Sequence, residues 1–193
     1  MKRTTFNLIA ILVLSCVALQ SHAQETKRKG FIGISLGPSI PFGEFKKDGL
    51  AKTGANISLI NFGYLFNGKV GVAANWFGAA HNIDSNNSEL SDVMWSYGGI
   101  MAGPLVSGQI SEDVDLDGRV QIGYSYASMD VNGVKLDGTG FAYGAGAGLR
   151  FHVSSLFSLS FMVDAFFSNN KGDYMDRKIQ AINPTVGFSY RLK

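Results

Sequence analysis

The sequence has little of what marks several common classes of protein. It contains one cysteine, Cys16, so a framework of disulfide bonds is excluded. Charged residues make up 17% of its 193 residues, below the roughly 25% of an average protein. This low charge, together with a high glycine content, excludes a disordered chain and a coiled coil. Basic residues form no stripe, which excludes a nucleic-acid-binding arm. Glycine is abundant instead, with 24 residues, and the length predicts one domain or at most two.

The first 23 residues have the pattern of a secretory signal peptide. Two cations precede an apolar stretch, and small residues lead to a cleavage site between Ala23 and Gln24. The apolar stretch is shorter than the roughly 20 residues of a membrane-spanning helix. Lipidation at Cys16 is an alternative, but Leu14 is bulky for a lipid-attachment motif. Cleavage would leave residues 24–29 as a short charged lead and remove the two cations, after which cationic and acidic residues are equal in number.

The rest of the chain is a series of segments in which apolar and polar residues alternate, with no amphipathic helix between them. Polar stretches rich in glycine and asparagine separate the segments. Short and longer connections alternate, which is typical of an up-and-down meander with two unlike ends. We expect eight strands at about 30–37, 54–66, 70–80, 93–106, 114–126, 140–151, 156–167 and 179–192.

The composition of the two strand faces indicates which face lies inside. In the segment 114–126, Val120 and Ile122 share one face, while Asp117 and Arg119 share the other. A soluble barrel would carry lysine and glutamate on its outer face, yet here Lys135, Lys171 and similar residues fall in expected connections. We therefore predict an apolar exterior in lipid, on a closed antiparallel barrel whose backbone groups all pair. The aromatic residues expected to form belts at the membrane surfaces are Trp76, Trp95, Tyr97, Tyr124, Tyr126, Phe141, Tyr143, Phe188 and Tyr190.

Several short motifs, in their order and spacing, carry a resemblance to a known family. They are Gly37-Pro38-Ser39-Ile40-Pro41-Phe42-Gly43-Glu44-Phe45, Asn61-Phe62-Gly63-Tyr64, Trp95-Ser96-Tyr97-Gly98 and Asn183-Pro184-Thr185-Val186-Gly187-Phe188-Ser189-Tyr190-Arg191. Across residues 30–193 the chain resembles the eight-stranded outer-membrane β-barrels, the OmpA transmembrane domain and OmpX, in the single-domain form typical of Bacteroidota. The resemblance implies a porin-family protein of the Gram-negative outer membrane, with long loops outside and short turns and residues 24–29 in the periplasm.

The resemblance also implies partners. The barrel would contact outer-membrane lipid, and the barrel-assembly machinery would read its last strand. Phe188, Tyr190 and Leu192 keep the spacing of that assembly signal, although the chain ends in Lys193 rather than an aromatic residue. We expect a monomer with no cofactor, and an extracellular ligand whose identity the loops do not reveal.

Charged residues on the inner face of the expected barrel are the candidate site. They are Asp115, Asp117, Arg119, Arg150, Asp164 and Arg191. Since buried charges must pair, and an eight-stranded barrel is just wide enough to be filled by side chains, we predict an ion network that plugs the lumen. Asp113 to Gly118 also resembles half of a calcium loop, but Tyr124 stands where the bidentate glutamate is needed, so luminal carboxylates are favoured.

Other residues invite a functional interpretation that the sequence does not support. His152-Val153-Ser154 resembles the His-x-Ser of outer-membrane lipid A deacylases, but Ser155 replaces the expected asparagine, and ordinary turn residues are favoured. His81 is expected to be a solvated loop residue. Glycine at alternate positions in 144–148 is expected to make room in the lumen. At Pro104 and Pro184 we predict a bulge or a missing hydrogen bond, because proline donates none.

Three functions follow, in decreasing order of support. The first is a non-enzymatic barrel with a plugged lumen that stiffens the membrane or binds an external partner through four extracellular loops. The second is a small porin-like passive conduit, which the glycine-rich inner faces would allow. The third is a lipid-modifying enzyme that uses His152 and Ser154.

Overall fold

The computed structural model describes residues 29–47, 51–83, 93–131, 134–173 and 175–192. The expected signal peptide, its cleavage site, Cys16 and nearly all of the lead lie outside these residues. Among the described residues, no helix has both the length and the apolar character needed to cross a membrane.

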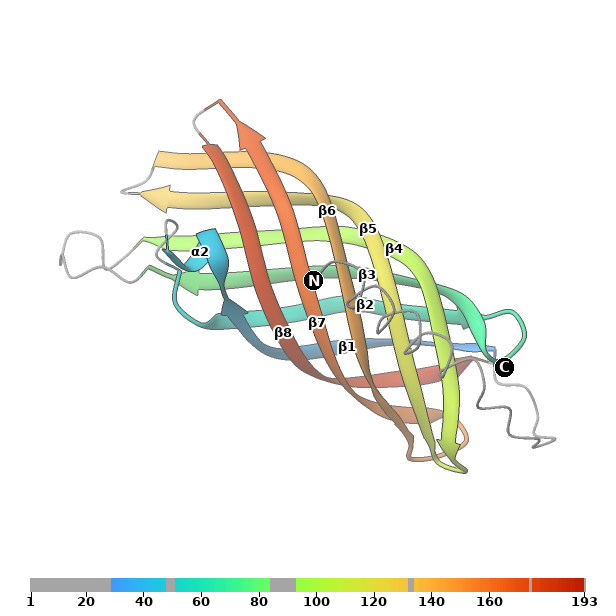
Figure 1. Ribbon diagram of the computed structural model, residues 1–193. Coiled ribbons are helices and arrows are strands. Elements are labelled where there is room, and N and C mark those ends of the chain that lie inside the picture. Colours follow the sequence, from blue (N-terminus) through green and yellow to red (C-terminus); the bar gives the residue numbers. More distant parts are fainter. Residues whose placement is uncertain (1–28, 48–50, 84–92, 132–133, 174, 193) are drawn as a thin grey trace, which may run out of the picture.

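Eight antiparallel strands close into one barrel, in which each strand pairs with its neighbours in the sequence (Figure 1). The ring closes between the first and last strands, where Gly30 lies opposite Leu192. This confirms the predicted fold, a closed up-and-down barrel of eight strands. The strands are β1 (Gly30–Pro41), β2 (Gly54–Leu65), β3 (Val70–Asn82), β4 (Met94–Ser111), β5 (Val114–Val131), β6 (Val134–His152), β7 (Phe157–Gly172) and β8 (Met175–Leu192).

The two ends of the barrel differ. One end, which we name the short-turn end, carries the β2–β3, β4–β5 and β6–β7 turns together with the first residue of β1 and the last of β8. The other end carries a helix, α2 (Gly43–Lys47), between β1 and β2, and we name it the α2 end (Figure 1). The prediction of no helix is wrong at this point, because a one-turn helix is too short to show an apolar period.

Three expected connections are mostly strand. The β5–β6 hairpin runs to the pair Val131 and Val134, the β7–β8 hairpin runs to Gly172 and Met175, and β4 continues to Ser111. These segments were expected to be loops because they are polar. The extensions follow from ladder pairing, which continues wherever a hairpin partner is available and does not require an apolar face.

The outward face of the barrel is apolar, and charged side chains on several strands point inward. Val120, Ile122 and Tyr124 are exposed on β5, while Asp117 and Arg119 are buried. Of the nine aromatic residues expected in the belts, seven face outward as such a belt requires: Trp76, Tyr124, Tyr126, Phe141, Tyr143, Phe188 and Tyr190 are all exposed.

The belt prediction is wrong for Trp95 and Tyr97, which lie inside the barrel with 2% and 3% of their surface exposed. Their position follows from the alternation on β4, where exposed Ile100 and Val106 fix even-numbered residues outside and odd-numbered residues inside. His81 is also not a solvated loop residue, because β3 continues through it and only 1% of it is exposed.

Both central prolines lie beside a gap in the ladder, and the register does not shift there. Between β4 and β5 the pairing stops after Ala102 and Ile122 and resumes, still in register, at Leu105 and Arg119. The ladder between β1 and β8 is interrupted in the same way around Pro184. Local loss of pairing is one of the two outcomes predicted for Pro104 and Pro184, and no bulge forms at either residue.

Candidate functional site

The lumen is the candidate site, and two layers of side chains fill it. An ionic layer built by Arg119, Arg150 and their partners lies toward the short-turn end. An aromatic layer lies toward the α2 end and includes Phe45 of α2.

Arg119 bridges three strands of the barrel wall. From β5, its Nε and Nη2 donate to the two carboxylate oxygens of Asp164 on β7, each at 2.8 Å, and its Nη1 donates to Asn61 Oδ1 on β2 at 2.8 Å. Arg119, Gly146 and Asp164 are register partners on β5, β6 and β7. A Cβ on Gly146 would collide with the Asp164 carboxylate. Glycine at this position therefore lets the bidentate pair form across β6. This agrees with the prediction that glycine at alternate positions in 144–148 makes room in the lumen.

Arg150 builds a second bridge nearer the short-turn end. Its Nε donates to Asp117 Oδ2 at 2.8 Å and its Nη2 to Asp117 Oδ1 at 3.0 Å, with Asp115 Oδ2 at 3.1 Å from Nη2. The same Nη2 reaches Ser107 Oγ at 3.3 Å. The guanidinium carbon lies 4.5 Å from the ring centre of Phe31, on the opposite strand β1. Two carboxylates and an aromatic face thus compensate for the desolvation of this cation.

His152 joins the ionic layer, whereas Ser154 does not. His152 Nε2 donates to Asp115 Oδ2 at 2.9 Å, since a carboxylate can only accept, and Nδ1 lies 3.4 Å from Ser158 Oγ. Ser154 Oγ instead accepts from the backbone N–H groups of Leu156 and Phe157. The His-x-Ser motif is therefore not a contacting pair, and Ser154 has the turn role that was favoured for it.

Arg191 lies in the lumen but forms no ion pair with the described carboxylates. Only 2% of it is exposed, and its Nη1 donates to the backbone oxygen of Ser154 at 2.9 Å. Its Nε and Nη2 have no hydrogen-bond partner. Five of the six predicted network residues therefore form the two arginine bridges. The sixth, Arg191, takes part in neither bridge and lies at the short-turn end.

The ionic layer leaves almost no free space. Between the two arginine bridges a cavity of about 10 Å³ remains, enough for about one water molecule. Its lining includes Asn61, Leu105, Asp117, Arg119 and Arg150. Among the described residues no group of three or more potential metal ligands occurs.

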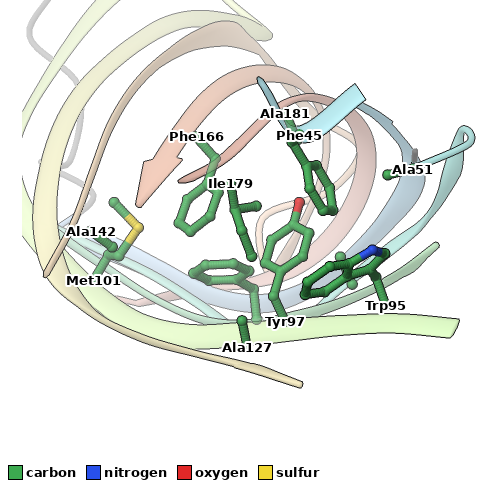
Figure 2. Close-up of a cluster of buried hydrophobic side chains, with 12 residues drawn as sticks. Phe45, Ala51, Trp95, Tyr97, Met101, Ala127, Ala142, Phe166, Ile179 and Ala181 are labelled. Atoms are coloured by element: carbon green, nitrogen blue, oxygen red, sulfur yellow. The ribbon is translucent and has the colours of Figure 1, made fainter. Parts of the chain in front are cut away.

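The aromatic layer closes the other end of the lumen (Figure 2). Tyr97 lies at its centre, stacked on Phe166 at 5.2 Å between ring centres. Tyr97 also stacks on His81, at 5.6 Å between ring centres. The hydroxyl of Tyr97 lies 3.0 Å from Ser39 Oγ, which itself donates to Asn183. This layer was not predicted from the sequence. The alternation along β4 was the available signal, because it places Trp95 and Tyr97 on the opposite face of the strand from Ile100.

Comparisons with known proteins agree with this architecture. The sequence profile of a family described as outer membrane protein beta-barrel domain matches residues 9–191. A search of curated proteins finds no match. Among solved structures, Neisserial surface protein A has a TM-score of 0.62 and 12% identity, covering 84% of this chain and 97% of its own.

Two further solved structures are similar to this chain. The attachment invasion locus protein Ail of Yersinia pestis, in complex with the heparin analogue sucrose octasulfate, has a TM-score of 0.51 and 20% identity, with 85% of this chain and 99% of that chain covered. The N-terminal β-barrel domain of OprF from Pseudomonas aeruginosa has a TM-score of 0.50 and 10% identity, covering 86% and 100%. At these identities the likeness is one of fold. The family match over most of the chain, together with the closed barrel and its apolar exterior, shows that this protein belongs to the outer membrane protein β-barrel domain family and resides in the outer membrane.

Proposed function

We propose that this protein is a non-enzymatic outer-membrane barrel that is closed to ions and presents its α2 end outside the cell as a structural or binding surface. The observation that carries the proposal is the pair of buried arginine bridges. Arg119 ties β5 to β7 and, across the lumen, to β2. Arg150 on β6 binds Asp117 of the neighbouring strand β5 and lies over the ring of Phe31 on β1.

The bridges support a closed barrel because of their burial and their bonding. Arg119 and Arg150 are each at most 6% exposed and are held by charge-assisted hydrogen bonds of 2.8–3.0 Å. Moving either guanidinium aside to admit ions would leave a buried carboxylate without its partner, at a cost of about 3–5 kcal/mol. The aromatic layer is a second obstruction on the same axis.

The serine residues support a non-enzymatic role. Ser154 uses its oxygen to hold a turn, and Ser158, which lies near His152, is fully buried. A nucleophile must reach the substrate and stand within hydrogen-bond distance of its base. Neither serine meets both conditions.

The unlike ends of the barrel support the proposed orientation. The β2–β3, β4–β5 and β6–β7 turns lie at one end with both ends of the barrel sequence, while α2 and the tips of the β5–β6 and β7–β8 hairpins lie at the other end. We place the short-turn end in the periplasm, where the assembly machinery would bind Phe188, Tyr190 and Leu192 of β8. The external partner is a ligand of the α2 end, and the barrel acts as a monomer.

Planar-bilayer recording of the refolded protein tests the closed lumen. We expect no stepwise conductance from the wild type or from Val120→Ala, a matched variant whose changed side chain faces outward on β5. Stepwise conductance of the wild type that changes in Arg119→Lys would overturn the proposal and identify the protein as a passive conduit.

Labelling of single cysteines in intact cells tests the orientation. The predicted mature chain has no cysteine, so Lys47→Cys at the α2 end and Ser155→Cys in the β6–β7 turn would each be unique, and both sites are exposed. A membrane-impermeant maleimide should label the first variant in intact cells and the second only after the outer membrane is opened. The reverse pattern would refute the orientation.

A further inference from the structure

Phe45 is the only residue of the helix α2 that is buried against the barrel. Phe45 is 2% exposed, whereas Glu44, Lys46 and Lys47 are exposed. The polar contacts of α2 with β8 lie at the surface: the Glu44 N–H donates to Gln180 Oε1 at 2.9 Å, and Lys178 Nζ donates to Glu44 Oε1 at 2.8 Å. A one-turn helix is not stable by itself, so α2 keeps its position through Phe45, these exposed contacts and two backbone hydrogen bonds. In those bonds the Lys46 N–H donates to the Phe42 oxygen, and the N–H of the buried Ala51 donates to the Phe45 oxygen.

Phe45 occupies an aromatic cage inside the barrel (Figure 2). Its ring makes edge contacts with Trp95 and Tyr97, at 5.9 Å each between ring centres. A third edge contact, with His81, has 5.1 Å between ring centres. We name these three residues and the space taken by the Phe45 ring the Phe45 cage. Edge contacts of this kind are how aromatic-lined sites hold a planar ring. Phe45 therefore stands where a small aromatic molecule would bind.

One wall of the cage carries a polar atom that Phe45 cannot satisfy. His81 Nδ1 lies 2.7 Å from the backbone oxygen of Lys52, and since that oxygen can only accept, Nδ1 carries the proton. His81 Nε2 is then an acceptor, and it is buried with no hydrogen-bond partner. A buried polar atom without a partner is costly. A ligand with one N–H or O–H group would remove that cost, which a phenylalanine ring cannot do.

The chain on the barrel side of α2 is suited to act as a hinge. Gly43 has a φ of 58°, which glycine adopts without strain. Just before it, Phe42 packs outside the cage on Phe167, at 5.6 Å between ring centres, and the Phe42 N–H donates to the Gln180 backbone oxygen. Rotation at Gly43 would lift Phe45 from the cage while Phe42 stays in place, once the Lys46 N–H releases the Phe42 oxygen and the Ala51 N–H releases the Phe45 oxygen.

We propose that the Phe45 cage is a binding site for a small aromatic molecule with one hydrogen-bond donor, such as a phenol, which takes the place of Phe45 when α2 lifts. The ligand ring would contact Trp95 and Tyr97, and its hydroxyl would donate to His81 Nε2. The ionic layer lies below the cage, so the site is a pocket with one entrance rather than a passage. This inference goes beyond the proposed function and does not depend on the orientation of the barrel.

Tryptophan fluorescence of the refolded protein can test the site. The chain has two tryptophans, and Trp76→Phe leaves Trp95 in the cage as the only reporter. The probes are para-cresol and toluene, which have nearly the same shape and differ in the hydroxyl. We expect saturable binding of para-cresol, and about five- to tenfold weaker binding of toluene, the value of about one hydrogen bond.

Three variants in this background separate the parts of the proposal. Phe45→Ala removes the competing ring and should tighten para-cresol binding about tenfold or more. Its matched control, Phe42→Ala, removes a ring of the same size outside the cage and should leave the affinity unchanged. His81→Gln retains an acceptor and should keep the preference for para-cresol, whereas His81→Phe should abolish it.

Several outcomes would overturn the proposal. Binding that appears only in Phe45→Ala would make Phe45 a permanent core residue. Equal affinities for the two probes would remove the role of His81, and a signal that never saturates would indicate partition into the detergent or lipid. Heat-modifiable gel migration identifies any variant that has not folded, and the comparison of the two probes in the Trp76→Phe protein stands without the other variants. A negative result here leaves the conductance and labelling tests unaffected.

Discussion

Removal of both partners of the Arg119 and Asp164 pair should destabilise the barrel far less than the two single removals added together. The two residues share two hydrogen bonds of 2.8 Å, and their side chains are 5% and 20% exposed. Loss of one partner from a buried pair costs about 3–5 kcal/mol, because a charge remains unpaired in a region of low dielectric constant. Since Asp164 keeps some contact with solvent, we expect about 3 kcal/mol for Arg119→Met and for Asp164→Asn.

The double variant isolates the interaction. Arg119→Met together with Asp164→Asn leaves no unpaired charge, so its cost should be below the sum of the single costs by about 2–3 kcal/mol, the upper part of the range for contacting residues. A parallel cycle of Arg119→Met with Val163→Ala provides the control, because Val163 is next to Asp164 on β7 but faces outward. That pair should be additive to within about 0.5 kcal/mol.

The measurement is reversible urea unfolding of the protein in lipid vesicles, followed by tryptophan fluorescence. Trp76 lies on the lipid-facing surface and Trp95 lies in the lumen. If the unfolding transitions reported by the two tryptophans coincide, a two-state treatment is justified. If the costs of Arg119→Met and Asp164→Asn simply add, or each is below about 1 kcal/mol, the pair does not behave as buried, and the argument for a closed lumen fails with it.

Three further predictions concern single residues. Gly146→Ala should cost about 1–3 kcal/mol by displacing the Asp164 carboxylate, whereas Gly108→Ala, where a Cβ meets nothing within 4 Å, should be nearly neutral in the same unfolding assay. Gly43→Ala should cost about 1–2 kcal/mol because of its left-handed backbone, visible as faster proteolysis of α2. Ser154→Ala should lose about 1 kcal/mol with its turn hydrogen bonds, while the lipid A profile of cells stays unchanged; a changed profile would support the enzyme hypothesis.

The sequence predicted which residues of a strand face inward, but not which inward-facing charged side chains bind one another. The alternation on β5 is enough to place Asp117 and Arg119 inside. That Arg119 binds Asp164, while Asp117 binds Arg150, depends on the register that places Gly146 between Arg119 and Asp164. Register involves residues far apart in the chain, and alternation carries no information about it.

The sequence-based errors concern residues near the α2 end. Trp95 and Tyr97 were assigned to an outer belt because aromatic residues near strand ends are typical of one, yet they fill the lumen instead. His81 was expected in solvent because it follows the expected strand 70–80 and was placed in the next loop. Its neighbours Phe45 and Tyr97 come from other parts of the chain, so its burial could not be predicted from local composition.

The sequence alone determined that this chain forms a closed β-barrel with an apolar exterior, because a period of two and the absence of lysine and glutamate from mid-strand positions are local properties. Only the tertiary structure decided how the lumen is filled: which arginine binds which carboxylate, that Arg191 stands apart, and that Phe45 occupies an aromatic cage. The physical reason is that these contacts arise when the ring closes and brings together side chains from strands and a helix that are distant in sequence.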